Sequence, residues 1–119
     1  MTNNKIAAPS MPLDMERFNI VTEGKSTYQE ELLTLFFYNS ADCLAVMERN
    51  YPGQDGQKWA AAAKELKNLS ENIGAQELYK ICAIAETLGV IADEDTKKIL
   101  DAIKIHLQRL RAFIRNTRY

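Results

Sequence analysis

The chain has 119 residues, of which 46% are hydrophobic and 26% are charged, and its formal net charge is −1. This length allows one domain with a single core, and this composition excludes a disordered chain. Five glycines and three prolines are few interruptions, which favours long helices over many short strands joined by turns.

The N-terminal 12 residues differ from the rest of the chain. Residues 1–12 are small and polar, contain two prolines and have no hydrophobic period, so we expect a mobile tail there. The folded domain is expected over residues 13–119. It begins with a short helix that includes Asp14 to Phe18 and ends before Gly24.

A long helix is predicted next, from Ser26 to the Tyr51-Pro52-Gly53 run. Ser26 and Gln29 have the spacing of a capping box. Apolar residues at three- and four-residue steps form its predicted core stripe: Leu32, Leu35, Phe36, Cys43, Val46 and Met47. Three further residues widen the apolar surface: Leu33, Phe37 and Leu44. This helix is therefore either deeply packed or partly kept for a partner.

Three more amphipathic helices are predicted after residue 54. The first begins near Asp55, ends at Gly74 and carries the stripe Trp59, Ala62, Leu66, Leu69 and Ile73. The second runs to Gly89 on the stripe Leu78, Ile81, Cys82, Ala85 and Leu88. The last follows the acidic residues 93–95, which suit a helix N-terminus, and its seam is Leu100, Ile103, Leu107, Leu110 and Ile114.

These stripes predict the fold class. Four amphipathic helices joined by short connections, with no strand pattern between them, bury their apolar sides by packing together. The sequence therefore predicts an all-α fold, an antiparallel up-down four-helix bundle with a short extra N-terminal helix.

Basic residues are concentrated in the last predicted helix. From Thr96 onward there are seven basic residues and one acid, a net charge of +6, against −7 for residues 1–95. Such a helix can contact nucleic acid or a membrane. We favour a solvated face whose cations suit the helix C-terminus, so neither nucleic acid nor a membrane is expected as a partner.

Cysteine and histidine usage limits the chemistry of the chain. Cys43 and Cys82 lie in apolar helical stretches without CxxC spacing, and we expect buried thiols in a reducing compartment, with a single disulfide as the alternative. No apolar run suits a signal peptide or a membrane span, so a cytoplasmic location is expected. One histidine and two separated cysteines do not make a usual zinc site. Without a glycine-rich phosphate loop or a Ser/His/Asp set, no metal, cofactor or catalytic residue is expected.

The helix that carries Trp59 exposes an unusual face. At about 100° per residue, Lys64 falls roughly 170° from the centre of the Trp59–Ile73 stripe and points at solvent. The neighbours on this face include Ala60, Ala61, Lys67, Asn68 and Glu71. Ala60 and Ala61 are small and lie one turn before Lys64, so a protein partner could approach closely. Alternatively, the alanines only favour the helix.

The run from Trp59 to Ala75 resembles the signature helix of histidine phosphotransfer (HPt) domains, roughly A-H-x-L-K-G-S-x-x-x-(I/L)-G-A. The matching residues are Ala63, Leu66, Lys67, Ile73, Gly74 and Ala75, and the resemblance covers roughly residues 13–114. Lys64 stands where the family carries its phosphoacceptor histidine, and Asn68 stands where it carries a small glycine. An exposed lysine is largely an ammonium group at neutral pH, without the lone pair that attacks phosphorus. Phosphotransfer through position 64 is therefore not expected.

The resemblance implies a binding protein of a two-component phosphorelay rather than an enzyme. Its expected partner is the receiver domain of a response regulator, or a histidine kinase. The expected partner-binding residues are Ala60, Ala61, Lys64, Lys67, Asn68 and Glu71. Lys67 matches the family lysine thought to help hold the phosphoryl group. Here it is interpreted either as a positive contact for an acidic partner or as an ordinary surface lysine.

Two other functions remain open on the sequence alone. The chain could be a helical interaction scaffold unrelated to receivers, or a homodimer that pairs through Leu33, Phe37 and Leu44, although a monomer is favoured. It could also transfer phosphate through a non-standard acceptor. The single histidine, His106, lies about 90° from the Leu100–Ile114 seam, which favours a packing or hydrogen-bonding role at the edge of the core.

Overall fold

The computed structural model describes residues 12–51, 55–88 and 94–118. Five helices occupy these ranges: α2 (Met15–Thr22), α3 (Ser26–Asn50), α4 (Gly56–Ile73), α5 (Gln76–Leu88) and α6 (Glu94–Arg118). The described ranges contain no strand, which confirms the predicted all-α bundle with a short extra helix. The predicted tail lies outside the described residues except for Pro12, and so do Pro52, Gly53, Gly89 and Asp93.

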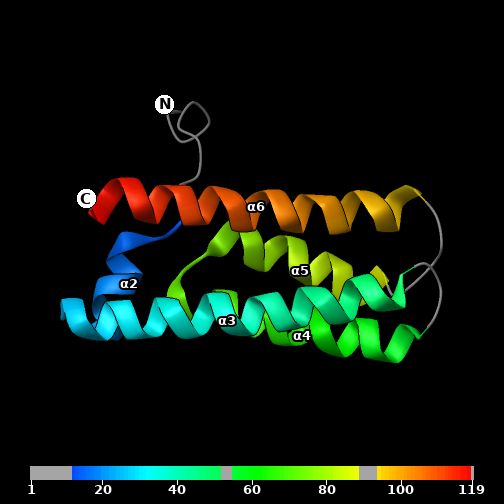
Figure 1. Ribbon diagram of the computed structural model, residues 1–119, viewed down its shortest axis with the longest axis horizontal. Helices are drawn as coiled ribbons and strands as arrows, with labels where there is room; N and C mark the ends of the chain where they lie inside the picture. Colours follow the sequence, from blue (N-terminus) through cyan, green and yellow to red (C-terminus); the bar gives the residue numbers. More distant parts are fainter. Residues whose placement is uncertain (1–11, 52–54, 89–93, 119) are drawn as a thin grey trace, which may run out of the picture.

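The helices form a bundle in a molecule of 41 × 39 × 20 Å, which is thin along one axis only. Helix α4 packs most extensively against α3 and α5, α5 in turn packs against α6, and α2 closes one end against α3 and α4. Figure 1 shows α6 along one long edge, α3 and α4 along the other, and α5 between them. Because α6 is held mainly by α5, the side of the bundle between α3 and α6 is the least closely packed.

Side-chain and backbone caps fix the ends of α2 and α4. Asp14 accepts a hydrogen bond from the Arg17 amide, and Asp55 accepts from the amides of Gln57 and Lys58, so both carboxylates satisfy N-terminal N–H groups. Helix α4 ends as predicted at Gly74, whose φ of 87° is left-handed. The Gly74 carbonyl accepts from the Asp14 amide at 2.8 Å, which ties the end of α4 to the start of α2.

The predicted capping box at the start of α3 is wrong. Lys25 is the N-cap residue and makes no side-chain cap hydrogen bond, and Ser26 is already helical. The Gln29 amide instead donates to Asn19 Oδ1 at 2.9 Å and to Thr22 Oγ1 at 3.0 Å. The tight turn between α2 and α3 brings Gln29 against α2, and this tertiary contact replaces the local one.

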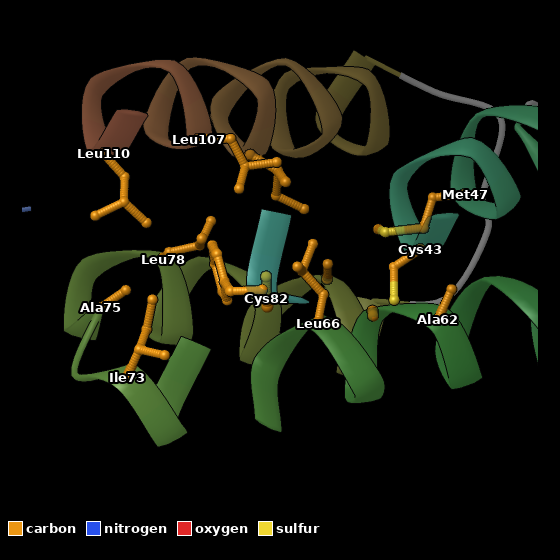
Figure 2. Close-up of a cluster of buried hydrophobic side chains, with 14 of the residues drawn as sticks. Cys43, Met47, Ala62, Leu66, Ile73, Ala75, Leu78, Cys82, Leu107 and Leu110 are labelled. Carbon is orange, nitrogen blue, oxygen red and sulfur yellow. The ribbon is translucent and has the colours of Figure 1, made fainter. Parts of the chain in front are cut away.

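The core runs through all five helices. Figure 2 shows Leu107 and Leu110 of α6 directed towards Leu78 and Cys82 of α5, with Leu66 of α4 close by. Trp59 is fully buried, and its indole Nε1 donates to the Ala85 carbonyl at 2.9 Å. The predicted stripes of α4, α5 and α6 are confirmed as the inward sides of these helices, with Leu69, Ile81, Leu88 and Ile114 at the partly buried edge.

The stripe predicted for α3 needs a correction. The buried residues of α3 are Leu33, Phe36, Ser40, Cys43 and Met47, whereas Leu35 is 57% exposed. The inward side passes through Ser40, and a polar residue does not count in an apolar period. The predicted stripe therefore includes the exposed Leu35, and it leaves out the buried Leu33, which the sequence assigned only to a wider apolar surface. Phe37 and Leu44 pack against the core as partly buried residues, so the wider apolar surface formed by these two residues serves packing within the bundle.

Candidate functional site: the outward face of α4

The six residues singled out from the sequence all lie on α4, on the side turned away from the core. We call this set the α4 face: Ala60, Ala61, Lys64, Lys67, Asn68 and Glu71. Ala61, Lys64, Asn68 and Glu71 are exposed, and Ala60 and Lys67 are half-buried. The α4 face is therefore open to a partner along most of the helix.

Lys64 is a lone cation at the centre of the α4 face. Its neighbours three and four residues away are Ala60, Ala61, Lys67 and Asn68, so no carboxylate lies one helical turn from it. The adjacent Glu65 is on the side of α4 that faces α3, and it lines the same hollow as Cys43. Across the described ranges, Lys64 makes no ion pair or side-chain hydrogen bond. Its ammonium group is left for solvent or for a partner.

Lys67 differs from Lys64 because its ammonium group is paired with a carboxylate of the same chain. Its Nζ lies 2.7 Å from Glu86 Oε1 on α5, and the two side chains are only 22% and 27% exposed. The hydrogen bond to Glu86 raises the pKa of Lys67, so the amine stays protonated. Lys67 therefore links α4 to α5. Its ammonium group can bind a partner only if it divides its hydrogen bonds between the partner and Glu86 or gives up the ion pair with Glu86.

At the Glu71 end, residues of α2 and α5 border the α4 face. Arg17 of α2 donates from Nε to the Glu71 carbonyl at 3.0 Å. A hollow of about 240 Å³ lies beside it, lined by Arg17, Glu71, Gln76, Tyr79 and Lys80. The sequence did not predict Arg17 and Lys80 as neighbours of the α4 face. They belong to α2 and α5, and the periodicity of α4 carries no information about residues of other helices.

At the Ala61 end, a hollow of about 270 Å³ lies between α3 and α4. Cys43 lines it, but burial, followed by the nearby Glu65 carboxylate, raises the pKa of this thiol from 9.0 to about 12. Burial, with a smaller contribution from Cys43, raises the pKa of Cys82 to about 12 as well. Both cysteines are free and buried, so the predicted buried thiols are confirmed and the disulfide alternative is wrong. At neutral pH neither is a thiolate nucleophile.

The remaining titratable candidate lies on α6, away from the α4 face. His106 is half-buried, and its Nδ1 lies 2.9 Å from the Ala102 carbonyl. A carbonyl oxygen only accepts hydrogen bonds, so Nδ1 carries the proton in this contact. This geometry agrees with the hydrogen-bonding role expected at the edge of the core. No cluster of His, Cys, Asp and Glu in the described ranges is suited to hold a metal ion, and no helix there is long and apolar enough to cross a bilayer.

A comparison with protein-family models matches the Hpt domain over residues 31–113, more than half of the chain. The chain belongs to the Hpt domain family. Hpt domains are helical bundles that carry phosphoryl groups in phosphorelays and interact with histidine kinases and receiver domains. The matched range contains the whole α4 face and α5. Comparisons with curated proteins and with solved structures found no match.

Proposed function

We propose that this Hpt domain binds the receiver domain of a response regulator, or a histidine kinase, through the α4 face without itself carrying phosphate. The observation that carries the proposal is Lys64, an exposed cation without an intramolecular partner in the described ranges, where the family's phosphoacceptor histidine is expected. Such a protein would compete with phosphate-carrying partners or tether a receiver.

The chemistry of the face suits an acidic partner. Receiver domains carry an acidic pocket around their phosphoacceptor aspartate, and a lysine ammonium there would form charge-assisted hydrogen bonds. Ala60 and Ala61 leave the approach to Lys64 unobstructed, while Lys67 is occupied by Glu86. Lys64 is therefore the cation of this face that a partner can engage without breaking an existing pair.

An NMR titration of the labelled protein with receiver domains from the same organism tests the docking face. We expect shifts gathered on the α4 face and at least tenfold weaker binding for Lys64→Glu and for Ala61→Trp, through charge reversal and steric block. Ala112→Trp, at an exposed alanine of α6, is the matched control and should bind as the wild type does. Equal affinity of Ala61→Trp and Ala112→Trp would refute the docking face.

Incubation with a phosphorylated receiver tests the loss of phosphotransfer. The wild-type chain should take up no phosphate, because an ammonium group is not a nucleophile. The double variant Lys64→His/Asn68→Gly, which restores both the imidazole and the small residue one turn later, should gain transfer. Phosphate uptake by the wild type that disappears in His106→Gln would instead support the non-standard acceptor.

The scaffold or homodimer alternative has one observation in its favour. Leu35 and Tyr38 lie one turn apart on α3 and are 57% and 69% exposed. Of the three residues expected to pair two copies, Leu33 is buried, and Phe37 and Leu44 are partly buried against the core. A dimeric mass in solution that becomes monomeric in Leu35→Lys would favour this alternative over receiver binding.

A further inference from the structure

Lys64 and Asn68 form a pair of hydrogen-bond donors at the centre of the α4 face. The two residues are four positions apart on α4, so their side chains are neighbours on the same side of the helix. Both are exposed, and in the described ranges neither side chain makes a hydrogen bond or an ion pair with another residue. The Lys64 ammonium group only donates, and the Asn68 carboxamide has two N–H groups. Both are therefore available to a ligand that accepts hydrogen bonds.

Little negative charge surrounds this donor pair. Glu65, next to Lys64 in the chain, is on the side of α4 that faces α3. Glu71 lies one turn beyond Asn68 and two turns from Lys64. It lines the same hollow as Arg17, and the positive charge of Arg17 offsets the charge of this carboxylate. The donor pair is therefore suited to an anionic ligand.

The two donors extend to different heights above α4. The ammonium group of Lys64 ends a chain of four methylene groups, whereas the carboxamide of Asn68 follows a single methylene group. A carboxylate recessed in the acidic pocket of a receiver is therefore within reach of the lysine only. A phosphoryl group on that carboxylate projects towards α4, adds negative charge and carries three acceptor oxygens, so it can accept hydrogen bonds from both donors at once.

We propose that the α4 face recognises the phosphorylated state of a receiver domain, because Lys64 and Asn68 together bind the acyl phosphate on the receiver's phosphoacceptor aspartate. This inference rests on the receiver binding proposed above and adds which state of the receiver is bound. Each of the two side chains donates a charge-assisted hydrogen bond to the phosphoryl oxygens. The phosphoryl group stays on the receiver, since neither an ammonium group nor a carboxamide is a nucleophile at neutral pH.

Calorimetric titration of the full chain with receiver domains from the same organism tests the inference, with each receiver measured in Mg²⁺ alone and in Mg²⁺ with beryllofluoride. Beryllofluoride bound to the aspartate is a stable analogue of the acyl phosphate. The wild-type chain should bind the beryllofluoride-treated form of its receiver at least about tenfold more tightly than the untreated form, the change expected from one additional hydrogen bond to a charged group.

Three variants assign this preference to the donor pair. Lys64→Met keeps a long side chain without the charge and should reduce the preference to less than about threefold. Asn68→Ala should weaken binding of the treated receiver by about fivefold and leave binding of the untreated receiver unchanged, because only the phosphoryl group reaches Asn68. Lys98→Met, at an exposed lysine of α6, makes the same change in net charge away from the α4 face and should keep the full preference.

The possible failures separate this inference from the proposed function. Equal affinity of the wild type for treated and untreated receivers, with NMR shifts on the α4 face, overturns the inference and leaves receiver binding intact. The inference is also overturned if Lys64→Met keeps the preference, or if Asn68→Ala binds both forms more tightly, since Asn68 then acts only as an obstacle. Absence of binding to every receiver in both forms overturns receiver binding and this inference with it.

Discussion

The α4–α5 pair and the α3–α6 pair hold the same bundle together in different ways. Between α4 and α5, the buried Trp59 indole is bonded to Ala85, and the Lys67–Glu86 ion pair is largely shielded from solvent. Between α3 and α6, the corresponding ion pair is 38% and 45% exposed, and a cleft remains between the helices. The packing is therefore tighter behind the α4 face than on the α3–α6 side, where a cleft remains.

The largest expected effect is the loss of stability when the buried tryptophan between α4 and α5 is removed. Trp59→Ala removes a fully buried indole and its hydrogen bond, and it should lower the free energy of unfolding by about 3–5 kcal/mol. Phe37→Ala, at a half-buried ring beside the cleft, should cost about 1 kcal/mol, the usual size for a single substitution. Urea denaturation measures both. An equal or larger loss for Phe37→Ala would show that the two helix pairs share the stability evenly.

The same contrast explains which parts of the fold could be predicted from the sequence. Around α4 and α5 the local signals agree with the tertiary structure: Asp55 caps α4, Gly74 ends it, and the Trp59–Ile73 stripe is its inward side. On α3 they conflict. Ser40 is polar yet buried, and Gln29 leaves its capping position to bond α2. Apolar spacing does not predict a buried serine, and a local capping pattern does not predict a contact with another helix. This is why Leu35 is wrongly assigned to the core and Gln29 to a capping box.

The candidate site was predictable only in part, for a similar reason. Helical geometry alone places Lys64 and Asn68 on the exposed side of α4, and the structure places them there. The same geometry gives Lys67 a neighbouring position but cannot show that Glu86, 19 residues later, takes up its charge. The cleft between α3 and α6 depends on how these two helices meet, which no spacing within either helix records.

A smaller loss of stability is expected at the end of α4, where Gly74 packs against α2. A Cβ on Gly74 would lie 3.2 Å from the Asp14 carbonyl oxygen and 3.4 Å from Arg17 Cβ, at a φ of 87°. Gly74→Ala should therefore cost about 2 kcal/mol through strain and through displacement of α2. Gly24 has a φ of 68° but nothing within 4 Å of such a Cβ, so Gly24→Ala should cost only about 1 kcal/mol for the backbone conformation. Equal losses in thermal unfolding would mean that the contact with α2 contributes nothing.

The smallest effect concerns the buried thiol of α5 and appears only at alkaline pH. The pKa of Cys82 is raised by burial from 9.0 to about 12 in the folded chain. Above pH 9 the unfolded chain therefore binds fewer protons than the folded one, so stability is constant below that pH and falls as pH rises towards 12. At pH 10 the loss from this thiol should be about 1 kcal/mol. Because the rest of the chain is the same in both proteins, the test is the difference between wild type and Cys82→Ala in urea denaturation at pH 8 and pH 10. The variant should lose less stability between the two pH values than the wild type does. Parallel losses would mean that water reaches Cys82 in the folded state, and the tight packing assigned to the α4–α5 side would then be wrong at this position.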